Sequence, residues 1–182
     1  MGGTPAKTRR SAIVDAAREH FLARGYEGTK IGDIAATLGI SKAAVSYYFR
    51  TKDTFLDELV EPLVSKLEAV VLHHTDSEWP NGVAQLLDAY LDVLLADAEI
   101  ARWVDTDIAV QAEHHFGERL RAITDQVVNT ISAGNGCVTE RIGALAVLGG
   151  IWRPLLELDT ENLRVHRREV LRAAMVSYRE IA

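Results

Sequence analysis

Cysteine is almost absent from this 182-residue sequence, in which Cys137 is the only one. A single thiol excludes an intrachain disulfide and a zinc site built from cysteines. No run of about eighteen apolar residues, the length that a membrane-spanning helix needs, occurs in the chain. The N-terminal segment MGGTPAKTRR also lacks the apolar core of a signal peptide. These absences predict a cytoplasmic protein without a membrane partner.

Sequence signatures of catalysis are missing as well. We find no glycine-rich phosphate loop, nucleophile elbow or paired-carboxylate motif. His73-His74 and Glu113-His114-His115 suggest a metal site, but neighbouring helical residues point about 100° apart, so neither pair can chelate an ion alone. One histidine from each pair and a carboxylate such as Glu113 would be needed. Leaving that combined site open as an alternative, we predict no enzyme, no cofactor and no metal.

The composition that is present is that of a protein with a core, because 48% of the residues are hydrophobic and 25% are charged. The length allows one domain or two small ones. The net charge of −6 is unevenly divided. Residues 1–55 contain nine Lys or Arg against five Asp or Glu, whereas residues 56–182 contain eleven against twenty-one. Attraction to phosphates is therefore expected only at the N-terminal end.

Within this basic end, residues 29–52 (TKIGDIAATLGISKAAVSYYFRTK) predict two short helices joined by a glycine turn. Thr29 is placed to cap a helix over 30–38, and Gly39 can adopt the positive φ that ends it. Ser41 can then cap the second helix. This order of cap, helix, glycine and cap predicts a compact helical pair.

The second helix has one apolar face and one face without an apolar stripe. Val45 and Phe49 can pack against the apolar residues of the first helix and turn, which are Ile31, Ile34, Leu38 and Ile40. Ala43 and Tyr47 lie about half a turn away and need another partner. Two helices joined in this way form a helix-turn-helix unit, whose second helix enters the major groove of DNA.

The segment GISKAAVSYYFRTKDTFL resembles the DNA-binding signature of the TetR family of bacterial transcriptional regulators. The preceding segment IVDAAREHFLARGYEGTKIGDIAATLG resembles that family's first two helices. Two helices of an ordinary bundle would also have the glycines and the apolar spacing. They would not explain the aromatic and basic residues at one helix end, which are Tyr47, Tyr48, Arg50 and Lys52. The resemblance implies an all-α fold, with a helix-turn-helix domain over 1–51 and a helical effector-binding and dimerisation domain over 52–182.

The resemblance also implies a set of DNA-contacting residues, which are Thr29, Lys30, Lys42, Ala43, Ala44, Ser46, Tyr47, Tyr48 and Lys52. Thr29 would meet a phosphate through its helix N-terminus. Ser46 stands where the family usually has tyrosine, and Ala43-Ala44 replaces a frequent Gly-Thr. Because alanine offers bases only methyl contact with thymine, we expect Lys42 and Tyr47 to be the principal direct readers. DNA shape would carry part of the selectivity.

Before this unit, one helix is predicted from its apolar stripe, which consists of Ile13, Ala16, Ala17, Phe21 and Leu22. It should close at Gly25 in a left-handed cap, with Tyr26 packing back onto it. Arg9 and Arg10 near its start could reach a phosphate or form a solvated arm.

After it, Thr51 can cap a helix that extends from about residue 52 to 72, with a bend at Pro62. That bend is either a lever between head and body or only a tolerated kink. Further helices are expected at 83–98, 99–104, 106–132, 139–158 and 161–181, with loops at 73–82 and 133–136.

The helix expected at 139–158 is apolar around most of its circumference and carries Gly143, Gly149 and Gly150, which let another backbone approach closely. Together with the amphipathic 161–181 helix it could form a four-helix interface in a homodimer, although a monomeric core is also compatible. The expected interface residues are Leu145, Leu148, Gly149, Trp152, Leu171, Ala174 and Tyr178. A dimer with recognition helices about 34 Å apart would read a palindromic operator in double-stranded DNA.

Regulators of the TetR family typically bind a small molecule between the helices that follow the DNA-binding head. The expected lining residues are Leu63, Leu67, Tyr90, Trp103, Phe116, His114 and Trp152, although aromatic residues on helical stripes are also ordinary core residues. Such a lining favours a mostly apolar effector. The sequence therefore predicts a repressor released from DNA by such a ligand. The alternative is a regulator whose body only dimerises or binds another protein.

Overall fold

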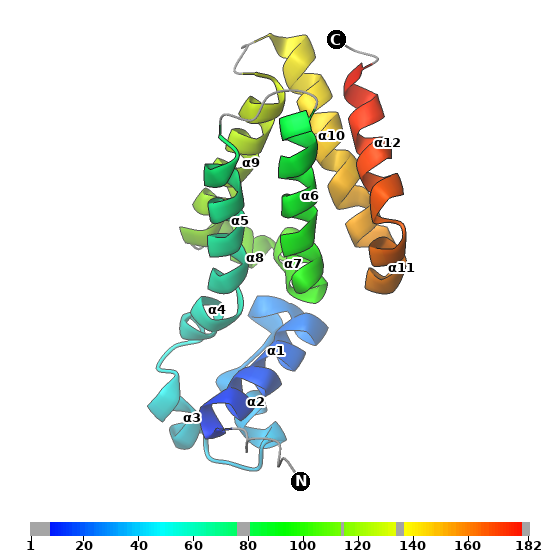
Figure 1. Ribbon diagram of the computed structural model, residues 1–182. Coiled ribbons are helices and arrows are strands. Elements are labelled where there is room, and N and C mark those ends of the chain that lie inside the picture. The colour runs from blue at the N-terminus through cyan, green and yellow to red at the C-terminus, as the bar shows by residue number, and fades with distance from the viewer. Residues whose placement is uncertain (1–7, 76–80, 114, 134–136, 180–182) are drawn as a thin grey trace.

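The computed structural model describes residues 8–75, 81–113, 115–133 and 137–179. Within these ranges the chain forms twelve helices and no strand (Figure 1), which confirms the all-α prediction. Among these helices, none is both long enough and apolar enough to cross a membrane.

The N-terminal helices form a compact head at one end of the molecule, and α4 leads from it into a body of roughly aligned helices (Figure 1). The head contains α1 (Arg9–Gly28), α2 (Ile31–Thr37) and α3 (Lys42–Tyr48), and α4 is Asp53–Leu59. The body helices are α5 (Glu61–His73), α6 (Asn81–Ala96), α7 (Ala98–Thr106), α8 (Ile108–Glu113), α9 (His115–Ile131), α10 (Val138–Glu157), α11 (Thr160–Val165) and α12 (Arg167–Arg179).

The last turn of α1 is interrupted at Gly25, which has φ +71° and ψ 174°. The positive φ confirms the predicted role of this glycine, but the predicted left-handed cap is wrong, because the extended ψ places Gly25 in a region that only glycine adopts readily. The break turns Tyr26 back onto the helix, where its ring stacks on Phe21 with centroids 5.9 Å apart.

The helix-turn-helix geometry follows the sequence closely. Gly39 has φ +64°, and the Ser41 hydroxyl accepts a hydrogen bond from the Ala44 amide at 3.1 Å. Val45 and Phe49 are buried as expected. The glycine turn and the second cap are therefore confirmed.

The first cap was predicted wrongly, because Lys30 and not Thr29 occupies the N-cap of α2. The Thr29 hydroxyl instead donates to the Gly25 carbonyl at 2.9 Å, and only 1% of the residue is exposed. The positive-φ turn at Gly25 aims this carbonyl at Thr29. The strongest local hydrogen bond of Thr29 thus stabilises the end of α1 and not the start of α2.

The predicted 52–72 helix is two helices, which meet at Val60. Pro62 lies in the first turn of α5, where its missing N–H removes no helical hydrogen bond. The expected bend at Pro62 is therefore displaced to a true break just before it. Thr51 is also not the cap of α4, since Lys52 holds that position without a side-chain hydrogen bond.

Two other predicted helices are divided. The 106–132 segment forms α8 and α9, and the 161–181 segment forms α11 and α12 with the change at His166. Gly117 explains the close packing of α8 and α9, because a Cβ there would lie 1.8 Å from the Gln111 carbonyl oxygen. The glycine was expected only to weaken one long helix, but it lets the start of α9 pack closely against α8.

A single buried apolar cluster runs from the head into the body. At the junction the Phe21 ring stacks on Trp103 of α7 with centroids 5.4 Å apart and meets Phe55 of α4 edge-on at 6.1 Å. Phe55 in turn stacks on Phe49, with ring centroids 4.2 Å apart. Phe49 directly follows the last residue of α3. Aromatic contacts therefore connect the recognition helix to α7 without a polar interruption.

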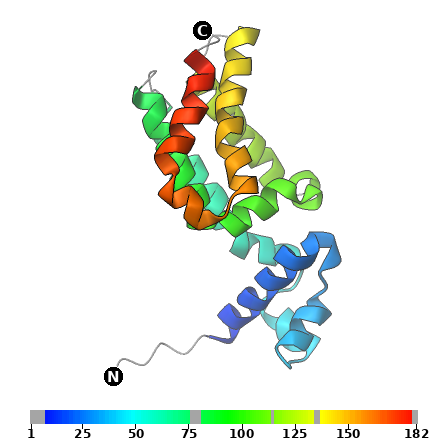
Figure 2. The same ribbon diagram turned by 90° about the vertical axis from the view of Figure 1, so that its right-hand side faces the viewer.

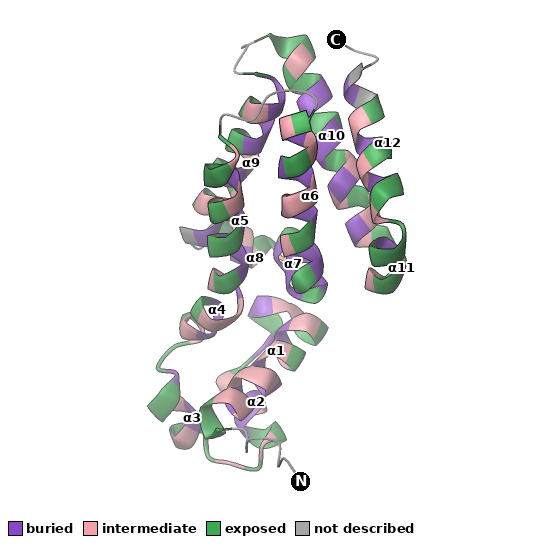
Figure 3. Ribbon diagram, viewed as in Figure 1, coloured by how far each residue is buried: buried purple, intermediate pink, exposed green. Residues whose placement is uncertain are grey.

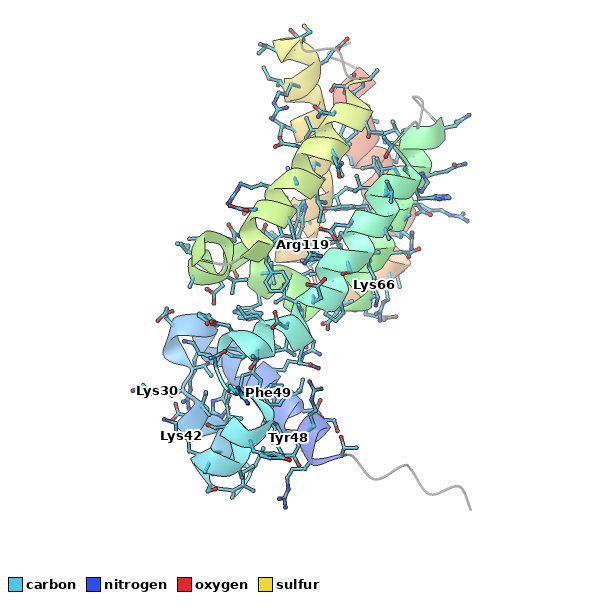
Figure 4. The ribbon with its side chains drawn as sticks, turned by 90° about the vertical axis from the view of Figure 1, so that its left-hand side faces the viewer. Lys30, Lys42, Tyr48, Phe49, Lys66 and Arg119 are labelled. Atoms are coloured by element: carbon cyan, nitrogen blue, oxygen red, sulfur yellow. The ribbon has the colours of Figure 1, made fainter. Side chains whose placement is uncertain are left out.

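Within the body, Arg119 of α9 (Figure 4) pairs with two carboxylates of α5. Its guanidinium donates to Glu61 at 2.6 and 2.9 Å and to Glu68 at 2.7 Å through two nitrogens. The hydrogen bonds from Arg119 lower the pKa of Glu68. Paired bidentate geometry of this kind fixes the spacing of the two helices more than a single surface ion pair would.

Helices α10 and α12 lie side by side along one edge of the body (Figure 2). A Cβ on Gly150 would lie 2.9 Å from the Ala174 Cα, and one on Gly143 would lie 2.8 Å from the Tyr178 ring. These glycines therefore bring α12 close to α10 within one chain. Ala174 and Tyr178 are buried at this contact and Leu148 is buried elsewhere on α10, so we withdraw all three from the predicted dimer surface.

Neighbouring glycines on α10 provide a test of this packing. Gly150→Ala should lower the free energy of unfolding by about 1–3 kcal/mol, because the new methyl group meets the backbone of α12. Gly149→Ala faces open space and should raise it by about 0.5–1 kcal/mol through helix propensity. Urea unfolding of the two variants measures the difference, and equal values would refute the close approach.

Candidate nucleic-acid interface

The exposed face of α3 consists of small residues and one projecting aromatic ring. Tyr47 is 83% exposed, Tyr48 is 39% exposed, and their rings meet edge-on at 5.2 Å. Lys42 and Ala43 are also exposed, whereas Ala44 and Ser46 are half-buried (Figure 3). Val45 and Phe49 on the opposite face anchor the helix to the core. The core thus holds α3 so that its uncovered face points away from the body.

The positive charges of the head fall into two groups. Arg18, Arg24 and Lys52 each lie within 4 Å of a carboxylate, and Arg10 is paired with Glu58. Four other cations have no ion pair in the part of the chain that the structure describes, and these are Arg9, Lys30, Lys42 and Arg50. Lys30 precedes α2, Lys42 begins α3 and Arg50 follows its end. Apart from Arg9 at the start of α1, the uncompensated charge of the head therefore lies next to the recognition helix in sequence, and Figure 4 shows Lys30 and Lys42 along one edge of the head.

Lys52 is tied into the head and is not free for a ligand. Its ammonium donates to the Tyr26 carbonyl at 2.7 Å and lies 3.9 Å from the centroid of the Tyr26 ring. Only 22% of the side chain is exposed. The Tyr26 hydroxyl donates to Asp53, so two consecutive residues at the start of α4 contact the same tyrosine. The structure gives Lys52 a clear role in fixing the end of the recognition unit.

Arg10 belongs to neither of its two expected environments. Its guanidinium pairs with Glu58 of α4, donating to one carboxylate oxygen at 2.9 Å, and lies 5.0 Å from the centroid of the Phe49 ring. The hydrogen bond from Arg10 lowers the pKa of Glu58. Arg10 therefore braces α1 against α4, and it is neither a solvated arm nor available for a phosphate.

Two site residues need comment against the sequence-based set. Thr29 is buried and uses its hydroxyl internally, so we remove its side chain from the candidate contacts. Arg50 was noticed in the basic cluster but left out of the set, and the structure exposes it directly after α3. Its position after the last apolar anchor, Phe49, is the sequence signal that could have included it.

The Asp107 carboxylate links the head to the body between α7 and α8. Its Oδ2 accepts hydrogen bonds from the Tyr26 amide at 2.7 Å and from Trp103 Nε1 at 2.9 Å. Its Oδ1 accepts from the amides of Ala109 and Val110 at 3.1 and 3.4 Å. One carboxylate thus satisfies donors from the turn after α1, from α7 and from α8.

The body contains a cavity of about 440 Å³ between α6, α7, α8, α9 and α10. Its lining residues are Tyr90, Val104, Asp105, Gln111, Gly117, Leu120, Arg121, Thr124, Asp125, Leu148 and Trp152. Burial raises the pKa of Tyr90 to about 12, and the charge of Asp105 acts in the same direction. The cavity has the size of a small-molecule site and a mixed apolar and polar wall.

Of the predicted lining residues, only Tyr90 and Trp152 border this cavity. Leu63 and Leu67 are core residues of α5, and Phe116 is fully buried. Trp103 belongs to the junction, where it stacks on Phe21. These four residues do not border this cavity, because an apolar helical stripe does not distinguish residues that fill a core from residues that border a void. His114 lies outside the described residues, as does part of the suggested histidine metal site.

Comparison with known proteins is consistent with this architecture. Residues 13–59 match the family model described as bacterial regulatory proteins, tetR family. The HTH-type transcriptional repressor AcnR of Corynebacterium diphtheriae is 23% identical over 168 residues, covering 74% of this chain and 86% of AcnR. The HTH-type transcriptional activator FasR of Mycolicibacterium smegmatis is 27% identical over 150 residues, covering 79% of this chain and 68% of FasR.

Solved structures show the same fold. A member of the TetR transcriptional regulator family from Streptomyces coelicolor A3 superposes with a TM-score of 0.73 at 19% identity, covering 97% of this chain and 92% of that one. The ketosteroid transcriptional regulator KstR2 of Mycobacterium tuberculosis gives a TM-score of 0.67 at 18% identity, covering 92% and 95%.

The chain belongs to the TetR family. It is therefore a TetR-family transcriptional regulator with a DNA-binding helix-turn-helix. The relatives named above are regulators of transcription and not enzymes. Within the TetR family both a repressor and an activator resemble this chain at similar identity.

The contacts of Lys52 predict a stability effect that an exposed lysine lacks. Lys52→Met should lower the free energy of unfolding by about 1–2 kcal/mol, because a charged hydrogen bond and a cation–π contact are lost. Lys42→Met removes the same charge at an exposed position and should change it by less than about 0.5 kcal/mol. Urea unfolding without DNA compares them, and an unchanged Lys52 variant would disprove the internal role.

Proposed function

We propose that this TetR-family regulator is a cytoplasmic, homodimeric repressor that binds a palindromic operator and is released by a mostly apolar ligand. The observation that carries the DNA contact is the coincidence of uncompensated charge with the exposed face of α3. Lys30, Lys42 and Arg50 surround that face, and Tyr47 projects from it. Charge directed at phosphates positions a protein on DNA, while side chains on the groove face read bases.

The proposed division of labour within the interface follows from reach. Lys42 and Tyr47 project furthest from the recognition helix and would read base edges. Lys30, Arg50 and Tyr48 flank the helix and would contact the sugar-phosphate backbone. Ala43, Ala44 and Ser46 are too short for bidentate hydrogen bonds, so their contribution would be close approach and methyl contact. Selectivity would then rest partly on the shape of the operator.

Dimerisation is supported by an apolar strip on α10 and α12 that no described residue of the chain covers. Ile142 and Leu145 are about half exposed on α10, and Gly149 follows one turn later with open space above it. Val176 of α12 is similarly exposed. The helices lie on the outer edge of the body (Figure 2), where the same strip of a second copy could pack against them. Of the predicted interface residues, Leu145 and Gly149 remain in this proposal as central contacts, with the half-buried Leu171 and Trp152 beside them.

Control by a ligand is supported by the position of the cavity next to the head–body junction. Val104 and Asp105 border the cavity, while Trp103 and Asp107 of the same corner hold Phe21 and Tyr26 of the head. A ligand that moved this corner would act on the orientation of the recognition helix. A full reversal of operator occupancy would require about 5.5 kcal/mol of preference for the non-binding state.

The predicted division at residues 51 and 52 is kept as a division of roles. The head through Thr51 would bind DNA, and the remainder would dimerise and bind the effector. The buried cluster is continuous across this boundary, so the two parts are proposed to share one core. A shared core makes the orientation of the head sensitive to the packing of the body.

The proposed DNA contacts are tested by selecting binding sites from random duplexes. Lys42→Ala should relax the base preference at one position of each half-site, because a direct reader is lost. Arg50→Gln should weaken all sequences similarly and reduce the slope of log affinity against log salt by about one, as expected for one phosphate contact. Identical preferences in wild type and Lys42→Ala would exclude Lys42 as a reader.

The dimer surface is tested by adding charge to it. Wild type should elute as a dimer in size-exclusion chromatography with light scattering. Leu145→Arg should be monomeric, because a buried unpaired charge at the interface is costly. Leu72→Arg is the control, since Leu72 of α5 is 78% exposed and lies outside α10 and α12. A dimeric Leu145→Arg, or loss of the dimer in both variants, would contradict the assignment.

A further inference from the structure

The cavity in the body combines an aromatic wall with one carboxylate that no cation neutralises. Tyr90 and Trp152 provide the aromatic wall, with Val104, Leu120 and Leu148 as its aliphatic residues. Asp105 enters the lining from α7. In the described part of the chain, its carboxylate forms no ion pair and receives no hydrogen bond from a side chain.

The remaining charges of the lining do not compensate Asp105. Asp125 is already paired with Arg141 at 3.0 Å. Arg121 of α9 also lines the cavity and, like Asp105, is exposed, but no ion pair joins the two in the described residues. Burial alone raises the pKa of Asp105, without a neighbouring positive charge to oppose it. The carboxylate also acts on the Tyr90 hydroxyl deep in the cavity, since its charge raises the Tyr90 pKa. Asp105 is therefore a partly desolvated negative charge within electrostatic range of the aromatic wall.

Two other polar residues of the cavity lining already donate hydrogen bonds within the chain. The Gln111 amide nitrogen donates to the backbone carbonyls of Val104, at 3.0 Å, and of Asp105. The Thr124 hydroxyl donates to the Leu120 carbonyl at 2.9 Å. These donors are unavailable for a ligand acceptor, whereas the Asp105 oxygens can accept. The cavity thus favours a ligand that brings a positive N–H donor of its own.

We propose that the cavity binds an organic amine, a cation with an apolar aromatic or alkyl body, whose ammonium group pairs with Asp105 and whose body lies against Tyr90 and Trp152. The aromatic faces add attraction for the same charge. The assignment rests on the proposed role of the cavity as the effector site and narrows the mostly apolar ligand to one with a single positive charge. Asp105 is then the residue that determines specificity.

The test uses three ligands with one carbon skeleton: 4-phenylbutylamine, 4-phenylbutanol and 4-phenylbutanoate. Isothermal titration of the full-length wild type at pH 7 should give the amine at least about tenfold tighter binding than the alcohol, since a charge-assisted hydrogen bond distinguishes them. The carboxylate should bind weakest. Asp105→Asn should reduce the affinity for the amine to that for the alcohol and leave the alcohol unchanged.

Glu118→Gln is the matched control, because it removes one negative charge from α9 outside the lining. It should keep the preference for the amine, which separates a local contact from the effect of net charge. Equal binding of amine and alcohol, tightest binding of the carboxylate, or no binding of the amine would each overturn the assignment. Loss of the preference in Glu118→Gln would do so as well.

A measurement of DNA release distinguishes failure of the proposed function from failure of the amine assignment. Fluorescence anisotropy on a duplex obtained by site selection measures whether the amine releases DNA. Binding that depends on Asp105 but leaves the DNA complex intact would support the amine class and refute release by the cavity ligand. Release by the alcohol and the amine at equal concentrations would support control by a ligand and refute the role of Asp105.

Discussion

The Asp107 carboxylate is the interaction on which the geometry of the molecule depends. It accepts donors from the last turn of α1 and from α7 and the start of α8, which lie on either side of it in sequence, so that the distant α1 is fixed to the α7–α8 corner by one side chain. Gly25 makes this meeting possible, because a Cβ there would lie 3.1 Å from Asp107 Oδ2 and its positive φ directs the next amide toward the carboxylate. Without that contact, α1 would still be joined to the body by the aromatic stack of Phe21 on Trp103 and by the ion pairs of Arg18 with Asp97 and Glu99.

Tyr26 extends this connection to the recognition unit. Its amide binds Asp107, its carbonyl accepts from Lys52, and its hydroxyl donates to Asp53. A displacement at the α7–α8 corner would thus reach the start of α4, just after the recognition unit, through one residue. Because packed interiors transmit small shifts without absorbing them, the path from cavity to recognition helix need not involve any large movement. The arrangement would give the proposed ligand of the body a short mechanical route to the DNA-binding face.

Sequence reasoning predicted the helix-turn-helix almost completely, because its determinants are local. The positive φ of Gly39, the Ser41 cap and the buried pair Val45 and Phe49 each follow from a few neighbouring residues. The Thr29 cap failed because Gly25 offers its carbonyl to that hydroxyl, a competition that only the folded turn reveals. Lys52 was expected at DNA for a related reason. A basic residue after a recognition helix looks available until Tyr26 folds back beneath it.

The body was less predictable, since its determinants are contacts between distant helices. The glycines of α10 correctly indicated close backbone approach, but sequence cannot tell whether the approaching helix belongs to the same chain. Ala174 fills the space at Gly150, which assigns that approach to α12. Gly149, one residue away, faces outward on the strip with Leu145. Two adjacent glycines of α10 therefore have different roles. Gly150 lies in the internal contact with α12, and Gly149 lies on the uncovered face. On another side of α10, Leu148 and Trp152 border the cavity. Because the uncovered strip lies on the same helix, a dimer formed there would support one wall of the ligand site, and the packing of the two copies would bear directly on the volume available to an effector.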